Sequence, residues 1–265
     1  MNVGLGWSQP REEEGYFMNR REKVLLGASV YIAALFGVMP AANAMHIMEG
    51  FLPVQYCIAW GVISLPFVVV GFQSIKKTLA KNRRALTLLA LAGAFVFVIS
   101  SLKIPSVTGS SSHMTGTGLG AMLFGPTATS VLGLIVLIFQ AVLLAHGGLT
   151  TLGANCFSMA IAGPLVSFGL YKGLSKTSLN RKVVIFIAAF LGDLFTYCVT
   201  AFQLALAHNE AVGFGTALVE NLGVFAVTQI PLAVVEGILT VIIMIGLETY
   251  AKPELKAIGF AKDGE

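Results

Sequence analysis

Residues 42–52 read Ala-Asn-Ala-Met-His-Ile-Met-Glu-Gly-Phe-Leu. The first three residues form the small-residue pattern A-x-A, which follows an apolar stretch at 24–39 and a basic flank at 20–23. A basic flank, an apolar core and small residues at the end are the three parts of a secretory signal peptide. We therefore expect cleavage after Ala44, which makes Met45 the N-terminus of the mature chain and places it outside the membrane.

Such a terminus is a ready-made metal chelate. The free α-amine of Met45, the backbone nitrogen of His46 and Nδ1 of its ring can bind one ion, because they close a five-membered and then a six-membered ring. Glu49 follows three residues later and could orient a ligand imidazole through a hydrogen bond. The alternative is that the alanines end a first membrane helix that stays attached, in which case His46 is an ordinary interfacial residue.

The composition is that of an integral membrane protein. Hydrophobic residues make up 56% of the 265 residues and charged residues 11%, whereas a soluble domain carries about 25% charge. The charged residues gather in short loops, so the net charge of +4 indicates orientation in a lipid bilayer and not nucleic-acid binding. The three cysteines lie in apolar segments and are expected to be packing residues.

The chain divides into three parts. Residues 1–44 are predicted to be a cytoplasmic tail plus the cleavable signal, residues 45–250 a single transmembrane metal-binding domain, and residues 251–265 a cytoplasmic C-terminal tail. The mature chain is predicted to be all-α with about seven transmembrane helices, because its apolar segments approach the roughly 20 residues that cross a bilayer. These segments are 54–73, 85–102, 112–125, 127–145, 151–171, 183–206 and 229–249. In the alternative count, 112–125 is re-entrant and 211–228 crosses instead.

The distribution of Lys and Arg favours the first count, because short cytoplasmic loops carry the excess of these residues. Seven crossings from an external Met45 place the basic clusters at 76–84, 172–182 and 252–262 inside. The alternative count leaves the cations of 172–182 outside. The favoured topology also puts the loops that hold His113 and His146 on the external face.

His113 follows a run of small hydroxyl residues and precedes a glycine-rich segment, so the backbone there can take irregular shapes. Nε2 of His113 could complete a four-nitrogen set with the terminal chelate. Planar nitrogen coordination suits nickel, copper and cobalt. His146 could be an outer-shell or entry residue, or it could cap carbonyls at a helix end. For Asp193, inside a membrane segment, a hydrogen bond between helices is expected.

No catalytic or energy-converting motif is visible. The sequence has no phosphate-binding loop, nucleophile elbow or H-E-x-x-H helix, so no catalytic residue is assigned and the chain is not expected to be an enzyme. The chain has residues that can bind a metal ion but no motif that could supply energy for its transport. We therefore infer a partner that hydrolyses ATP.

Three motifs carry a resemblance to a known family. Met45 to Pro53 (Met-His-Ile-Met-Glu-Gly-Phe-Leu-Pro), Ser110 to Ala121 (Ser-Ser-Ser-His-Met-Thr-Gly-Thr-Gly-Leu-Gly-Ala) and His146 to Asn155 (His-Gly-Gly-Leu-Thr-Thr-Leu-Gly-Ala-Asn) strongly resemble the CbiM family. Members are substrate-binding (S) components of energy-coupling-factor cobalt transporters, and the nickel proteins called NikM are close relatives. The likeness covers about residues 45–250. Met114 departs from the family, in which proline often follows this histidine.

The resemblance implies a fold, a site and partners. The fold is an S-component-like bundle with an extra N-terminal helix, in a bacterial inner membrane. The ligands carried over by motif are Met45, His46 and His113. The implied partners are a small membrane subunit (CbiN), a transmembrane coupling subunit (CbiQ) and an ATPase (CbiO), which together supply cobalt for cobalamin synthesis.

The metal is expected to be Co²⁺ as transported cargo, and no separate cofactor is expected. Nickel is the alternative, because nitrogen-rich planar sites do not themselves separate the two ions. The form Met-His-Ile-Met-Glu-Gly favours the cobalt branch, since the nickel branch tends to have proline and aspartate at the fourth and fifth positions. Rival functions are a self-sufficient secondary carrier for an organic solute and a membrane enzyme or assembly factor with a structural metal.

Overall fold

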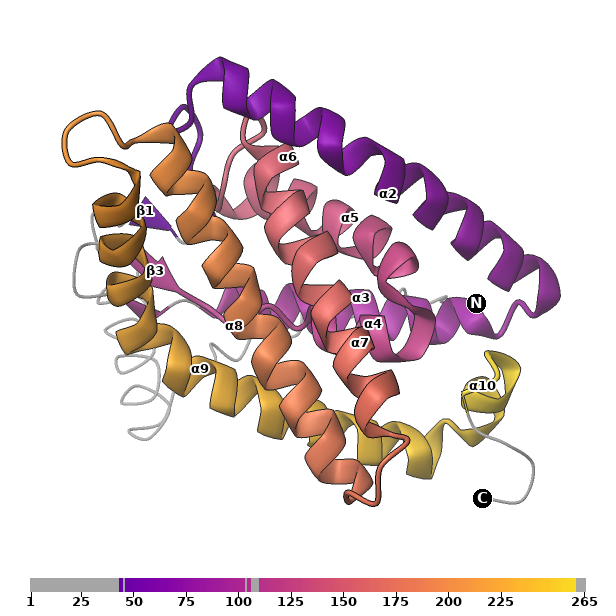
Figure 1. The fold of residues 1–265 in the computed structure, drawn as a ribbon. Coiled ribbons are helices and arrows are strands. Elements are labelled where there is room, and N and C mark those ends of the chain that lie inside the picture. Colours follow the sequence, from indigo (N-terminus) through magenta and orange to yellow (C-terminus); the bar gives the residue numbers. More distant parts are fainter. Residues whose placement is uncertain (1–42, 45, 103, 106–109, 261–265) are drawn as a thin grey trace, which may run out of the picture. The chain divides into compact units, whose positions relative to one another are not determined.

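The computed structural model describes residues 43–44, 46–102, 104–105 and 110–260. Met45 and the predicted signal segment up to Ala42 lie outside the described residues, so the expected signal helix and cleavage stay predictions. The described residues lie in one compact unit, and its architecture is almost entirely helical (Figure 1).

Helices account for most of the described chain, and proline or glycine marks many of their starts. Pro126 stands in the first turn of its helix and Gly213 directly precedes another, consistent with the fixed φ of proline and the open conformations of glycine. The elements are α2 (Val54–Lys81), α3 (Ala85–Ser101), α4 (Thr117–Phe124), α5 (Pro126–Leu144), α6 (Leu152–Asn155), the π-helix η1 (Cys156–Ala162), α7 (Gly163–Leu174), α8 (Arg181–Ala207), α9 (Phe214–Tyr250) and α10 (Lys252–Ala257).

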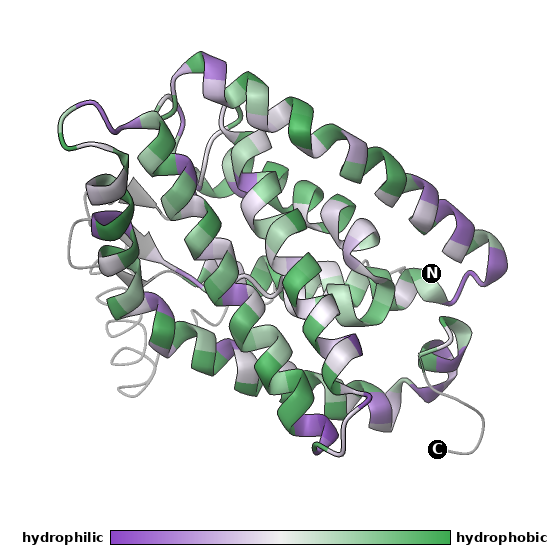
Figure 2. Ribbon diagram, viewed as in Figure 1, coloured by the Kyte–Doolittle hydropathy of each residue, from purple (hydrophilic) through white to green (hydrophobic). Residues whose placement is uncertain are grey.

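The helices are long and apolar enough to cross a membrane at five places in the described chain. These candidate spans are α2, α5, the continuous stretch Leu152–Leu174, α8 and α9, and α3 adds a shorter apolar helix of 17 residues. Figure 2 shows hydrophobic residues along the outer faces of these helices, as lipid exposure requires. The predicted all-α membrane fold is confirmed, with five to six candidate spans.

In the described chain, six of the about seven predicted membrane segments contain a long apolar helix, and 112–125 does not. The segment 112–125 contains only the eight-residue helix α4, about 12 Å long at 1.5 Å per residue, which is too short by itself to span a hydrocarbon core of about 30 Å. Together with the non-helical residues before it, the segment still runs back along α3, because Met114 clusters with Ile99 near the end of α3 and Leu123 with Leu88 near its start. The residues before α4 are not helical, because Gly116 has a φ of 69° and the N–H groups of Thr115 and Gly116 donate to the Glu236 side chain. The segment 211–228 is not a separate crossing either, since most of it belongs to the 37-residue helix α9.

Helix α9 bends partway along its length (Figure 1). It contains Pro231, which lacks an N–H and clashes with the preceding turn, the usual cause of a helix kink. Residues on both sides of Pro231 therefore face the same non-helical segment before α4. Thr228 Oγ1 lies 2.5 Å from Ser112 Oγ, and Glu236 accepts a hydrogen bond from Gly116 N at 2.9 Å.

A small sheet, which sequence reasoning did not predict, joins two of these non-helical segments. Its strands are β1 (Asn43–Ala44), β2 (Ile104–Pro105) and β3 (Ser110–Ser112), in the order β1-β3-β2. β1 pairs with β3 in parallel, with Asn43 opposite Ser110, and β2 pairs with β3 antiparallel. The sheet ties the chain just before Met45 to the chain just before His113.

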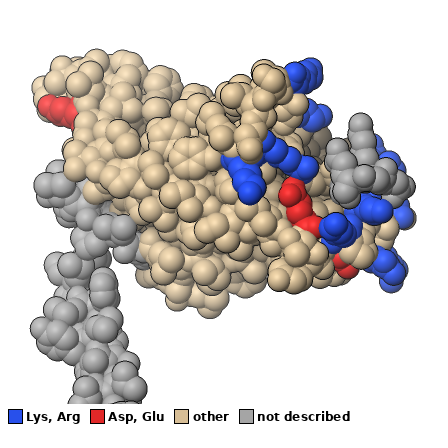
Figure 3. All heavy atoms as spheres, turned by 90° about the horizontal axis from the view of Figure 1, so that it is seen from below, with Lys and Arg blue, Asp and Glu red and all other residues tan. Residues whose placement is uncertain are grey.

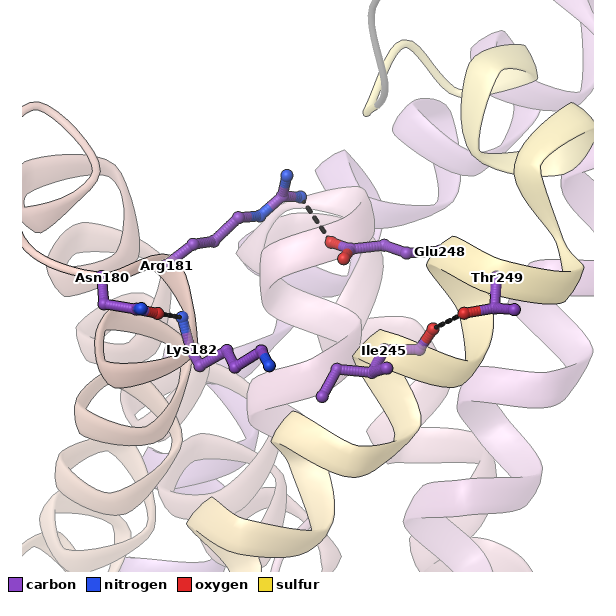
Figure 4. Close-up of polar contacts among 6 residues, drawn as sticks. All are labelled: Asn180, Arg181, Lys182, Ile245, Glu248 and Thr249. Carbon is purple, nitrogen blue, oxygen red and sulfur yellow. Dashed lines mark hydrogen bonds and ion pairs between the residues drawn. The ribbon is translucent and has the colours of Figure 1, made fainter.

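Charged side chains gather at one end of the described surface (Figure 3). At this end Arg181 Nη2 and Glu248 Oε1 form an ion pair of 2.8 Å between the start of α8 and the end of α9 (Figure 4). Both side chains are more than a third exposed, so the pair contributes at most about 1 kcal/mol. Asn180 caps α8 by accepting a hydrogen bond from Lys182 N at 2.9 Å.

Close contact of small residues sets the distance between α2 and α6. A Cβ on Gly153 would lie 2.5 Å from Cα and N of Gly61, and backbone atoms cannot move aside. Ser64 Oγ donates to Gly153 O at 3.0 Å across the same contact. Small residues allow such close helix approach in membranes, and here they fix α6, which carries Asn155.

We predict that Gly153→Ala destabilises the protein by about 1–3 kcal/mol, because overpacking forces α2 and α6 apart. Gly169→Ala is the matched control, since no atom lies within 4 Å of its new Cβ and alanine favours a helix over glycine by roughly 0.5–1 kcal/mol. Thermal unfolding in detergent should show a lower midpoint for the first variant and an equal or higher one for the second. Equal midpoints for Gly153→Ala and the parent would contradict this close contact.

Candidate metal centre

Three histidines from separate loops meet inside the helical bundle. His46 precedes α2, His113 precedes α4, and His146 lies between α5 and α6. Their ring centroids are 4.5 Å (His46–His113), 4.5 Å (His46–His146) and 4.9 Å (His113–His146) apart. One nitrogen from each ring lies within 4.8 Å of the others, and all three residues are buried. Three imidazoles in one buried place form a nitrogen-donor set of the kind that suits a late transition metal.

The backbone beside His46 is held by side chains of the loop and helix that follow His146. Ile47 N donates to Asn155 Oδ1 at 2.8 Å, and Asn155 Nδ2 donates back to Ile47 O at 3.0 Å. Thr151 Oγ1 also donates to Ile47 O, at 2.5 Å. The Asn155 amide therefore pairs with Ile47 as a neighbouring strand would, and this fixes the position of His46.

The ring of His46 is oriented by an amide. His46 Nε2 lies 3.0 Å from Gln140 Oε1, and Gln140 Nε2 donates to Ser100 Oγ at 2.7 Å. Because an amide oxygen only accepts, His46 Nε2 is the donor. In the neutral ring the lone pair therefore sits on Nδ1. This is the nitrogen that the predicted terminal chelate requires.

His113 has the opposite tautomer. Its Nδ1 lies 2.9 Å from Met114 O, and a carbonyl oxygen only accepts, so Nδ1 carries the proton. The lone pair of the neutral ring is then on Nε2, the nitrogen predicted from the sequence to be a ligand. Fixing the tautomer of a ligand histidine from its far side is a common property of metal sites.

The ring of His146 lies 4.5 Å from that of His46 and 4.9 Å from that of His113, nearer than its predicted outer-shell role implies. Its position depends on a tight turn at the end of α5, where Ala145 and Gly147 have φ values of 47° and 79°. A Cβ on Gly147 would lie 3.1 Å from His46 Cβ and 3.3 Å from Asn155 Nδ2. The absence of a side chain at Gly147 allows the His146 loop to approach His46.

Glu49 is exposed, and its described contacts go to the loop after His146. Thr150 N donates to Glu49 Oε2 at 3.1 Å. Hydrogen bonds from the Thr150 side chain and backbone hold the pKa of the Glu49 carboxyl below its ordinary value. Glu49 thus links the N-terminal turn to the 146–151 loop. Met45, the remaining predicted ligand, lies outside the described residues.

Sequence reasoning missed the residues that orient the rings. Gln140 and Asn155 are buried amides within apolar helices, and no role was assigned to Asn155. Asp193 and Glu236 are also buried, and both accept a hydrogen bond from Thr115 N, two residues after His113. The available signal was their polarity, because polar residues inside membrane segments are rare and usually functional.

Five candidate membrane spans and a buried cluster of three imidazoles define an integral membrane protein with a set of nitrogen donors that could hold a metal ion. Residues 46–255 match the family model CbiM, "Cobalt uptake substrate-specific transmembrane region". The chain therefore belongs to the CbiM family. Its relatives are transport components, and the chain is not an enzyme.

Curated relatives and solved structures agree with this membership. The cobalt transport protein CbiM of Lachnoclostridium phytofermentans is 65% identical over 93% of this chain and 99% of its own length. That of Chlorobium limicola is 55% identical over 92% and 98%. A crystal structure of a truncated transition metal transporter is 27% identical, with a TM-score of 0.69 over 77% of this chain and 99% of that one.

We predict that Asn155→Ala weakens Co²⁺ binding by roughly tenfold to a hundredfold, because it leaves the buried Ile47 N–H without its acceptor and frees the His46 segment. Titration of the detergent-purified protein measures the dissociation constant. Asn180→Ala is the control: it removes a helix cap at the other end of the molecule (Figure 4), costs about 1 kcal/mol of stability and leaves the affinity unchanged. Equal affinities for both variants would contradict the role of Asn155.

Proposed function

We propose that this chain is the metal-capturing component of an ATP-driven cobalt importer. The single observation that carries the proposal is the tautomer pattern: hydrogen bonds place the lone pair of His46 on Nδ1 and that of His113 on Nε2, in rings whose centroids lie 4.5 Å apart. Two buried imidazoles prepared in this way each offer a nitrogen lone pair as a metal ligand.

The proposed ligand set is the α-amine of Met45, the backbone nitrogen and Nδ1 of His46, and Nε2 of His113. The free amine requires cleavage after Ala44. Cleavage also removes β1, whose residues pair with Ser110 and Ser111 in the uncut chain. His146 lies in the same ring cluster and is proposed to bind the ion from one side or to enclose it. Glu49 supports the site through the 146–151 loop.

Co²⁺ is proposed over Ni²⁺. The curated relatives named above are cobalt transport proteins, and the segment Met-His-Ile-Met-Glu-Gly at 45–50 has the form that favours cobalt. The donor set alone suits both ions.

The proposed orientation places the histidine cluster toward the outside of the cell membrane and the C-terminus in the cytoplasm. The basic residues near the ends of α2, α7 and α9 support it, because positively charged loops face the cytoplasm. Membership in the CbiM family supports a complex with CbiN-, CbiQ- and CbiO-like subunits, the last an ATPase. Cobalt accumulation by vesicles that contain this chain alone would instead indicate a secondary carrier.

We predict that His113→Ala weakens Co²⁺ binding by at least about 10–100-fold, since changes outside the ligand shell alone cost that much. His208→Ala is the matched control, because His208 is a solvent-accessible histidine that contacts the backbone of Phe51 instead of the cluster. Titration of both variants with Co²⁺ measures the effect. Parent-like affinity in the His113 variant would remove His113 from the ligand set and overturn the proposal.

We predict that Co²⁺ affinity falls between pH 8 and pH 5.5 by more than one decade per unit over part of the range. Metal binding displaces protons from the amine, with a reference pKa of about 7.7–8.0, and from the imidazoles, at about 6.5. Glu49 does not contribute, because hydrogen bonds hold its pKa below the ordinary carboxyl value and it stays charged throughout this window. Dissociation constants measured across the range test this, and a flat profile would indicate carboxylate ligands.

A further inference from the structure

The non-helical segment that carries His113 is held by four buried side chains of α8 and α9. We call them the loop clamp: Tyr197, Asp193, Gln229 and Glu236. On one side of the segment, His113 O accepts hydrogen bonds from Tyr197 Oη at 2.5 Å and from Gln229 Nε2 at 3.3 Å.

On the other side, the carboxylates accept from backbone N–H groups. Thr115 N donates to Glu236 Oε2 at 2.6 Å and lies 3.2 Å from Asp193 Oδ1. Gly116 N donates to Glu236 Oε1 at 2.9 Å. Gln229 Nε2 also donates to Asp193 Oδ2, so the two halves of the clamp are joined.

Gln229 and Asp193 form the hydrogen bond between helices that was predicted for Asp193, but the contacts of the clamp go beyond the pairing of α8 with α9. Asp193 lies midway along α8, where a buried carboxylate is costly, yet both carboxylates accept hydrogen bonds from the loop. Glu236 also lies at the N-terminal end of α4, where Gly116 precedes the first helical residue and the positive end of the helix dipole favours an anion. Acceptor oxygens of the clamp are therefore directed at the segment that begins with His113.

One peptide group connects the carboxylates to the imidazole. Met114 O and Thr115 N belong to the same planar peptide unit. Its N–H donates to Glu236, and its carbonyl oxygen accepts from His113 Nδ1. A carboxylate on the N–H polarises the carbonyl, which then holds the Nδ1 proton more firmly. In many metal sites a carboxylate accepts the far-side N–H of a ligand histidine directly. Here the carboxylate has the same effect on His113 through one peptide group.

We propose that Asp193 and Glu236 are positioning residues for the metal centre, acting on His113 through the peptide between Met114 and Thr115. They orient this peptide, fix the Nδ1–H tautomer and direct Nε2 of His113 toward His46 and His146. This inference rests on the proposed function, because it assigns the clamp a role only if His113 binds the metal.

The test uses Glu236→Gln in the full-length protein, where an NH₂ group replaces an oxygen that faces a backbone N–H donor. We expect the Co²⁺ dissociation constant to rise about 10–100-fold and the visible absorption of bound Co²⁺ to shift, with an unchanged number of sites per folded chain. Glu220→Gln is the control, because Glu220 is an exposed carboxylate on the same helix, and it should match the parent in all three measurements.

The outcomes separate the two proposals. Glu236→Gln could reduce the number of Co²⁺ sites per chain while the remaining sites keep the dissociation constant and spectrum of the parent. That result would show a purely structural role and overturn the positioning role. Unchanged binding in Glu236→Gln would also overturn it while leaving the proposed function intact. A parent that binds no Co²⁺ would overturn both.

Tyr197→Phe provides a gentler variant should Glu236→Gln fail to fold. It removes the hydroxyl that donates to His113 O but keeps the ring that packs on Phe225, 5.9 Å away between centroids. We expect a several-fold weaker affinity and a shifted Co²⁺ spectrum. If both match those of the parent, the clamp does not position His113.

Discussion

Non-helical backbone inside a membrane protein must find its hydrogen-bond partners within the protein, because lipid offers none. The segments that carry His46 and His113 both meet this constraint in the same way. Polar side chains from apolar helices pair with the backbone next to the histidine: Asn155 with Ile47, and Glu236 with Thr115 and Gly116. The residues that satisfy the irregular backbone are thus the ones that fix the clustered imidazole rings.

This constraint also explains the distribution of polar residues along the helices. Gln140 on α5 and Gln229 on α9 are both nearly fully buried, and each contacts a histidine-bearing segment through its amide. The bend of α9, which contains Pro231, allows residues on both sides of the proline to reach the same loop. The kink and the buried amides therefore serve one purpose, which is to hold short histidine-bearing loops inside a helical bundle.

Much of this could be predicted from the sequence. Apolar composition gave the membrane fold, and three motifs gave the family and the places of His46 and His113. The helix count was wrong at 112–125, because its apolar glycine-rich residues have a helix-like hydropathy but fold into a loop and the short helix α4. The roles of Asn155, Asp193 and Glu236 could not be predicted, since their partners lie 78–121 residues away in sequence. Only the fold brings these groups together.

The terminal chelate is the central claim, and one measurement tests it most directly: titration with Co²⁺ of the processed protein carrying one alanine inserted between Met45 and His46. The insertion leaves His46, His113 and His146 in place but moves the imidazole out of the two-ring chelate with the α-amine. We predict that binding is largely lost, whereas the parent binds one ion per chain. Undiminished affinity in the insertion variant would show that the amine is not a ligand and would contradict the account.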